Sequence, residues 1–267
     1  MSKRTNFILL TTLALSGFSL PFITAAAVGS PYTSSNLGYD VSFNAHSYPA
    51  TSFNFGIVGV SGGKAFVDND RLASEYSWAR FGPSTAPTIY MNLNAPYGST
   101  VAGHIESPKS CPPIATISIV STEPTTCEGY NYGYNAAQHA YAYAKSNGVT
   151  SSLWWLDIEE ANSWSSDPAV NDATIQGAID YLNAEGIRVG IYSTPDMWQD
   201  IAGSDFVPTQ TINGDKVSTP NWLPVGIMSQ IDALYACVTD TGFISGSPIW
   251  LVQYEANSTA VDQNIAC

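Results

Sequence analysis

Two acidic residues, Asp157 and Glu159, follow the apolar run from Leu153 to Leu156. The run predicts a buried strand, and side chains two positions apart on a strand point to the same side. The two carboxylates should therefore project together from the strand end, while Glu160 turns the other way. Like charges held close separate their pKa values, so one carboxyl can keep a proton while the other ionises. Glycoside hydrolysis uses such a pair; a strand that ends in a solvated acidic turn is the alternative.

The elements that would position this pair alternate between strand-like and helix-like segments. The predicted strands span residues 37–43, 53–61, 88–94, 153–159, 188–193, 221–229 and 248–254, with an eighth beginning in 261–264. The predicted helices span residues 70–81, 134–147, 168–185 and 195–201, and a long Pro/Ser/Thr-rich loop covers 95–128. This alternation predicts parallel β/α architecture. About eight strands in about 240 residues favour one domain of the α/β class, a (β/α)8 TIM-type barrel, regular or irregular.

Acidic residues fall at the ends of three of these predicted strands. Asp40 lies near the end of the first strand, Asp157 and Glu159 end the fourth, and Asp262 lies at the last. In barrels of this type the chemistry sits at the carboxyl ends of the strands. The four side chains are therefore expected on one rim.

The N-terminus has the pattern of a secretory signal. Lys3 and Arg4 precede an apolar stretch that is broken by hydroxyl residues, and Ala25-Ala26-Ala27 offers a small-residue cleavage site. We expect a signal peptide over residues 1–27, a mature domain over 28–267 and an extracellular location. An uncleaved membrane anchor is disfavoured because the stretch is short and interrupted. The mature protein is expected to be a monomer with no membrane attachment.

The charge balance excludes one large class of partner. The chain holds 22 acidic and 9 basic residues, a net charge of −13. Loss of Lys3 and Arg4 leaves 7 minus 22, or −15. Such a chain is not expected to bind nucleic acid.

Four cysteines, an even number in an exported chain, indicate disulfides. Three pairings are possible, and we favour the local one, Cys111 with Cys127 and Cys237 with Cys267. The spacing matches no zinc-ligand pattern, and the three histidines are scattered along the chain. We expect no metal and no organic cofactor.

Several short runs, taken in order, resemble the family 25 glycoside hydrolases, the lysozyme-type muramidases. They are Gly38–Ser42, Asp157–Glu159, Gly190–Ser193 with Trp198 after it, Trp250–Tyr254 and Val261–Asn264. The chain is also similar to a group of exported actinobacterial proteins of unestablished activity. The resemblance implies a β/α barrel that acts on peptidoglycan or a related β-linked amino-sugar glycan.

The resemblance also implies roles for the four acidic residues. Glu159 would be the general acid that protonates the glycosidic oxygen. Asp157 would stay ionised and stabilise the oxocarbenium charge, or orient a substrate acetamido group that itself attacks. Asp40 and Asp262 would complete the acidic floor and set the pKa values of the pair.

The chain departs from the family pattern after the second strand. Many members carry a carboxylate there, whereas this chain reads Ser61-Gly62-Gly63-Lys64. A catalytically inactive glycan-binding or surface protein on the same barrel, or a hydrolase of another polysaccharide, are therefore alternatives.

Aromatic rings near the predicted rim are candidates for stacking on sugars. Trp155 is the strongest, because it shares a side of its strand with Asp157, and packing in the core is the alternative for each ring. The expected substrate-binding residues are Trp155, Tyr192, Tyr90, Trp198 and Gln253.

Overall fold

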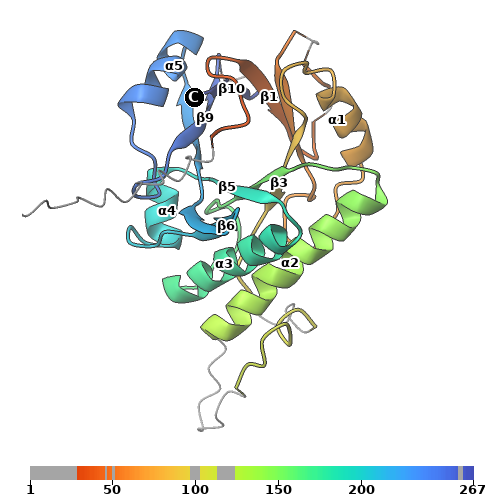
Figure 1. Cartoon of the computed structure of the whole chain (residues 1–267), viewed down its shortest axis with the longest axis vertical. Helices are drawn as coiled ribbons and strands as arrows, with labels where there is room; N and C mark the ends of the chain where they lie inside the picture. Colours follow the sequence, from red (N-terminus) through yellow and green to blue (C-terminus); the bar gives the residue numbers. More distant parts are fainter. Residues whose placement is uncertain (1–28, 46, 50–51, 97–102, 113–123, 258–260) are drawn as a thin grey trace, which may run out of the picture.

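The computed structural model describes residues 29–45, 47–49, 52–96, 103–112, 124–257 and 261–267. Within them, eight strands form a closed barrel in the order β1-β10-β9-β8-β5-β4-β3-β2 (Figure 1). The barrel strands are β1 (Leu37–Val41), β2 (Phe55–Gly59), β3 (Thr88–Asn92), β4 (Leu153–Asp157), β5 (Arg188–Tyr192), β8 (Asn221–Ile227), β9 (Ile249–Glu255) and β10 (Gln263–Ala266). The predicted α/β barrel is confirmed. The predicted signal peptide lies outside the described residues.

One strand breaks the expected parallel pattern. β10 pairs antiparallel with both β9 and β1, whereas the other neighbours in the barrel are parallel. A parallel return needs a crossover of about a dozen residues or more, and the chain between Glu255 and Gln263 is shorter than that. The barrel is thus irregular at its closure.

Five helices accompany the barrel in the described residues. They are α1 (Leu72–Ala79), α2 (Thr126–Ser146), α3 (Pro168–Ala184), α4 (Pro195–Ile201) and α5 (Gln230–Thr239). The sequence did not predict α5 or the hairpin of β6 (Thr209–Ile212) and β7 (Asp215–Ser218). The start of α3 is as predicted. Asp167 is the N-cap, where its Oδ1 accepts a hydrogen bond from the backbone N–H of Ala169 at 3.0 Å, and Pro168 is the first residue of the helix.

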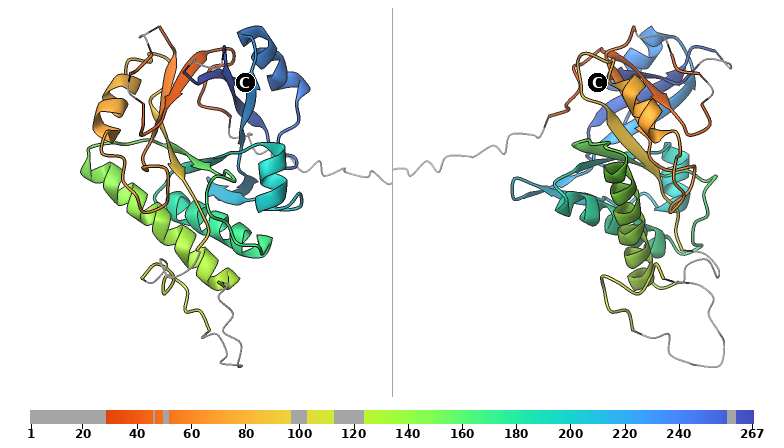
Figure 2. Two further views of the ribbon diagram at one scale, coloured as in Figure 1. Left: turned by 180° about the vertical axis from the view of Figure 1, so that it is seen from behind. Right: turned by 90° about the vertical axis from the view of Figure 1, so that its right-hand side faces the viewer.

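Helix α2 begins at Thr126, eight residues before the predicted start at Tyr134. Thr125 and Glu128 form a capping box there, and the predicted 95–128 loop is shorter as a result. The first turns of α2 were not predicted from the sequence, because they contain Gly129 and Gly133 and glycine is a poor helix former. Their lack of side chains lets α2 lie directly against α3, and the two helices run side by side across one face of the barrel (Figure 2).

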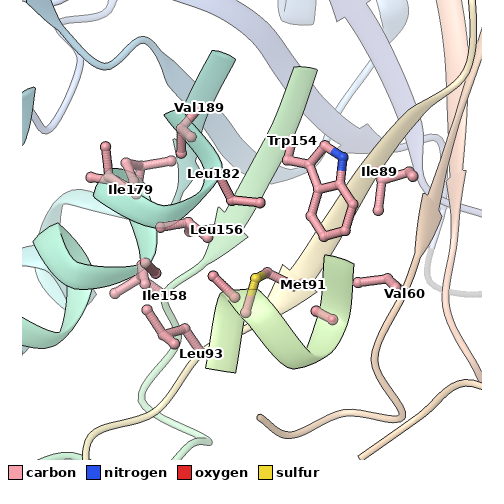
Figure 3. Packing of buried hydrophobic residues seen from close by; sticks show 14 of the residues in the cluster. Val60, Ile89, Met91, Leu93, Trp154, Leu156, Ile158, Ile179, Leu182 and Val189 are labelled. Carbon is pink, nitrogen blue, oxygen red and sulfur yellow. The ribbon is translucent and has the colours of Figure 1, made fainter. Parts of the chain in front are cut away.

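The apolar core has two layers. One fills the barrel interior and includes Phe55, Ile57 and Trp155. The other lies between the strands and the helices, where Trp154, Leu156 and Met91 pack against helical side chains (Figure 3). Successive residues of β4 thus alternate between the layers, as expected for a strand that is buried on both faces. This alternation directs Asp157 to the interior side at the end of the strand.

Both predicted disulfides are present, Cys111–Cys127 and Cys237–Cys267. The first ties the segment before α2 to its first turn. The second joins α5 to the last residue of the chain, directly after β10. In the parts of the chain that the structure describes, no helix combines the length and apolar character needed to cross a membrane.

Candidate active site

A pocket of about 250 Å³ opens at the carboxyl ends of the barrel strands. All four acidic residues that the sequence singled out line it: Asp40, Asp157, Glu159 and Asp262. Tyr90, Tyr192 and Gln253 line it too, as expected for residues that could contact a substrate. The remaining lining residues are Ser42, Phe43, Asn44, Asn92 and Trp222.

Two predicted substrate contacts lie elsewhere. Trp155 is 0% exposed and packs inside the barrel, where its Nε1 donates to the hydroxyl of Tyr32 at 3.2 Å. Trp198 is 1% exposed and packs between Phe206 and Phe243. Trp155 does point to the same side of β4 as Asp157, but it lies two residues earlier on the strand, so the barrel core covers its ring. Neither indole presents a face to a sugar.

Asp40 is held by a network of hydrogen bonds that joins five neighbouring strands, β1, β10, β9, β8 and β5. Asn264 Nδ2 donates to Asp40 Oδ1 at 2.7 Å, and Gln253 Nε2 donates to both carboxyl oxygens at 3.1 Å. Each amide is itself oriented: Tyr192 OH donates to Gln253 Oε1 at 2.9 Å, and Trp222 Nε1 donates to Asn264 Oδ1 at 2.7 Å. The carboxyl group therefore has a fixed orientation.

Asp157 is oriented from the opposite side. Asn92 Nδ2 donates to Asp157 Oδ2, and Asn92 Oδ1 accepts from Ser61 Oγ at 3.0 Å. The backbone N–H of Asn92 also donates to Ser61 Oγ, at 2.8 Å. Ser61, at the position where the sequence departs from the family pattern, thus aligns the amide that contacts Asp157. The other carboxyl oxygen of Asp157, Oδ1, is buried without a hydrogen-bond partner among the described residues.

Burial is the main influence on the acidity of the cluster. It raises the pKa of Asp157 well above the ordinary value, and the charge of Glu159 adds to the effect. Burial also raises the pKa of Glu159, which is only half-buried, whereas the side-chain hydrogen bond with Asp157 lowers it. The same hydrogen bond raises the pKa of Asp157. Because the two carboxyls are neighbours, they titrate as a pair, and the pair holds a proton at a pH where free carboxyls are ionised.

The two outer carboxyls are shifted in the same direction. Burial, together with the charge of Asp262, raises the pKa of Asp40 to about 8. Burial raises the pKa of Asp262 to about 6, with a contribution from the charge of Glu255. The pocket can therefore both donate a proton and place negative charge beside a developing cation.

Several residues of the site were missed from the sequence, among them Asn92, Trp222 and Asn264. Asn92 lies two positions after Tyr90 on a predicted strand, so the alternation rule could have placed it on the interior side. Trp222 and Asn264 also lie on predicted strands, but their partners are known only once the register across the barrel is known. Among the described residues, no cluster of three or more His, Cys, Asp or Glu side chains could hold a metal ion.

Comparisons with known proteins find similarity to lysozyme-like proteins. The model of the family described as lysozyme-like protein 1 matches residues 120–212, which run from just before α2 to the end of β6. Counting factor 45-1 of Dictyostelium discoideum is 25% identical over 141 residues, 51% of this chain and 47% of that protein. Probable GH family 25 lysozyme 3 of the same organism is 36% identical over 62 residues, 23% of this chain and 13% of that protein. The chain thus spans less than half the length of these curated relatives.

Among solved structures, the spore cortex lytic enzyme SleM of Clostridium perfringens has a similar fold. The TM-score is 0.53 at 10% identity, over 87% of this chain and 67% of that one. The chain therefore resembles the family 25 lysozyme-type proteins in sequence and fold, as the ordered motifs predicted. The similarity to exported actinobacterial proteins stays a prediction.

Proposed function

We propose that the protein is a secreted glycoside hydrolase that cleaves β-linked amino-sugar glycan of the peptidoglycan type. The observation that carries the proposal is the pair Asp157 and Glu159, set at a barrel rim in a pocket with two further carboxyls. The named relatives support it, because one is called a probable lysozyme and the structural neighbour a cortex lytic enzyme. The mature domain over residues 28–267 would act as a monomer, without a cofactor.

In this proposal the pair supplies one proton. Glu159 is the more exposed member, so it is the group that reaches the glycosidic oxygen and protonates it. The C–O bond then breaks, the leaving sugar departs with the proton as its free hydroxyl, and positive charge develops on the ring carbon and ring oxygen. That charge offsets the repulsion between Glu159 and Asp157, both now ionised, so protonation and bond cleavage assist each other. Water finally adds to the ring carbon, directly or after an intermediate, and returns a proton to Glu159.

Asp157 would act on the developing cation, or on the acetamido group of the substrate if that group is the nucleophile. Either role needs a fixed carboxylate, and Asn92 supplies the constraint by donating to Oδ2. A side-chain hydrogen bond with Glu159 couples the two carboxyls. Asp262 adds negative charge at the same rim above about pH 6, and Asp40 does so only above about pH 8. Tyr90, Tyr192 and Gln253 would contact the sugar.

The test compares two neighbouring variants on peptidoglycan and on chitin-type oligosaccharides, with new reducing ends as the readout. Glu159→Gln should lower turnover by about 10²–10⁴-fold, the range for loss of a general acid. Glu160→Gln makes the same chemical change on an exposed side chain outside the pocket and should keep wild-type turnover. Equal activity in both variants would refute the role of Glu159. Absence of products from folded wild-type protein would refute hydrolysis of these glycans.

A non-catalytic glycan-binding protein is the second candidate. It is favoured by the run Ser61–Lys64 after β2, a region where many family members carry a carboxylate. Here Ser61 serves instead as a hydrogen-bond support for Asn92. Titration of soluble oligosaccharides would separate the candidates, since binding without products supports the second one.

A further inference from the structure

A second cavity, of about 480 Å³, opens at the amino ends of β3, β4 and β5, the end of the barrel opposite the acidic pocket. This basal hollow lies within the size range of pockets that bind small molecules. Its walls come from α1, α2 and the segments that lead into the three strands. The side chains that give it its chemical character are Tyr76, Tyr141, Lys145, Trp154 and Glu185.

Hydrogen bonds fix the walls of the basal hollow. The hydroxyl of Tyr76 on α1 donates to the carbonyl of Thr150 at 2.6 Å. The backbone N–H of Arg188, at the start of β5, donates to the carbonyl of Ser152 at 3.0 Å. The connection between α2 and β4 is thus tied to α1 on one side and to β5 on the other, so the hollow exists before any ligand arrives.

Trp154 lines the hollow with a polar group that the protein leaves unsatisfied. The side chain is only 1% exposed, and its Nε1 is buried without a hydrogen-bond partner among the described residues. Figure 3 shows this nitrogen on the edge of the indole ring that points away from Leu156 and Ile158, further along the chain. The nitrogen therefore faces the amino end of β4, where the hollow opens. A buried donor without an acceptor is costly, so a ligand oxygen would recover that loss.

Two tyrosine rings form the sides of the hollow. Tyr76 and Tyr141 are both half-buried. The ring of Tyr141 lies beside that of Trp154, with centroids 6.4 Å apart and planes tilted by 54°. Partly exposed aromatic rings offer a large flat apolar area with a polar tip. Such a surface suits a sugar ring, which has an apolar face and polar hydroxyls around its edge.

The charges in the lining cancel. Its charged residues are Lys145 and Glu185, both exposed. Lys145 Nζ lies 5.8 Å from the centroid of the Tyr141 ring, so the ammonium group is close to the aromatic side of the hollow. A hollow of no net charge favours an uncharged ligand in this acidic protein. Hydroxyl groups fit the set, because they can accept from an ammonium or an indole N–H and donate to a carboxylate.

We propose that the basal hollow binds one uncharged sugar ring of a polysaccharide. A hydroxyl oxygen of the sugar accepts from Trp154 Nε1, its apolar face lies against Tyr141, and other hydroxyls bond Lys145 and Glu185. The inference goes beyond the proposed function, because a sugar held here touches none of the four carboxyls at the other end of the barrel. The site holds the protein on a polysaccharide independently of cleavage.

Indole N–H resonances report on both ends of the barrel in one titration, since Trp154 lines the basal hollow and Trp222 lines the acidic pocket. The mature protein carrying Glu159→Gln would be labelled with ¹⁵N and titrated with a chitin-type and a cellulose-type tetrasaccharide, both uncharged. The Trp154 resonance should move saturably downfield with at least one of them, as expected for an N–H that gains an acceptor. Its midpoint should differ from that of Trp222.

Two variants and a matched control test the geometry. Tyr141→Leu removes the stacking ring and should raise the Trp154 midpoint about threefold to tenfold, the range for loss of one aromatic contact, without changing the Trp222 response. Ala86→Leu fills the hollow from an exposed lining position and should weaken the Trp154 response while sparing the packed rings. Tyr235→Leu makes the tyrosine change on the exposed face of α5 and should leave both midpoints unchanged.

A Trp154 resonance that neither sugar moves would overturn the inference, as would equal weakening in Tyr141→Leu and Tyr235→Leu. Identical midpoints for Trp154 and Trp222 in every variant would also overturn it, because the sugar would then bind at the acidic pocket alone. The proposed function fails by a different result, the absence of new reducing ends from the wild type, so the two failures are distinguishable.

Discussion

At the scale of single residues, Asp40 connects the site to the pH dependence of stability. Its pKa is raised from 3.8 to about 8, so the folded protein binds this proton more tightly than the unfolded chain. Stability from this group is therefore full below about pH 4 and is lost as the pH rises through about 8. Asp40→Asn cannot titrate, so between pH 4.5 and pH 8 it should lose at least about 1 kcal/mol less stability than wild type loses, since one pKa unit corresponds to about 1.4 kcal/mol.

Urea unfolding at pH 4.5, 6 and 8 would measure this difference. Asp215→Asn, on the exposed β7, makes the same change away from the site and should follow the wild-type pH profile. Parallel profiles for Asp40→Asn and wild type would show that the buried carboxyl does not control the pH dependence. Activity should fall in Asp40→Asn alone.

The carboxylates were predictable from the sequence, whereas their partners were not. Asp40, Asp157 and Glu159 follow apolar strands, and the period-two rule is enough to place them at the rim. Asn264, in contrast, reaches Asp40 across a strand pair whose antiparallel direction depends on the short connection before β10. The prediction that Trp155 contacts substrate was wrong for a related reason. The alternation pattern gives the side of the strand on which a residue lies, but not its depth below the rim of the barrel.

At the scale of elements, the contact between α2 and α3 depends on glycines. A Cβ at Gly133 would overlap the carbonyl oxygen of Thr174, and one at Gly177 would overlap that of Tyr130. Gly133→Ala should gain helix propensity but lose more through displaced backbone, with a net destabilisation of about 1–3 kcal/mol. Thermal unfolding beside Gln138→Ala, at an exposed position of α2, would test it. A Gly133→Ala protein as stable as wild type would mean that the helices can separate without cost.

Helix α5 shows why some elements escape prediction. Its buried face carries the small residues Ala233 and Ala236, while Ile231, Tyr235 and Val238 are exposed. The usual amphipathic pattern is thus reversed, and periodicity gives no indication of which face packs. The strands were easier to predict, because barrel strands buried on both faces are continuous apolar runs.

At the scale of the whole molecule, closure of the barrel depends on β10, and a disulfide holds its end. Cys267 follows β10 directly and joins Cys237 on α5, across 30 residues of chain. By loop entropy, Cys237→Ala/Cys267→Ala should lose about 3–4 kcal/mol of stability. Cys111→Ala/Cys127→Ala opens a bridge of separation 16 away from the barrel strands and should lose about 3 kcal/mol.

The two disulfide variants should differ in activity even though their stability losses are similar. β10 carries Asn264, which donates to Asp40, and its other edge pairs with β9, which carries Gln253. Loosening β10 therefore releases both amides that orient Asp40, whereas opening Cys111–Cys127 leaves that hydrogen-bond chain intact. Turnover per folded molecule, measured well below each melting temperature, should fall severalfold in the Cys237/Cys267 variant and stay near wild type in the Cys111/Cys127 variant. Equal turnover in both would mean that β1 and β9 alone fix the orientation of Asp40, and that the last strand contributes only to stability.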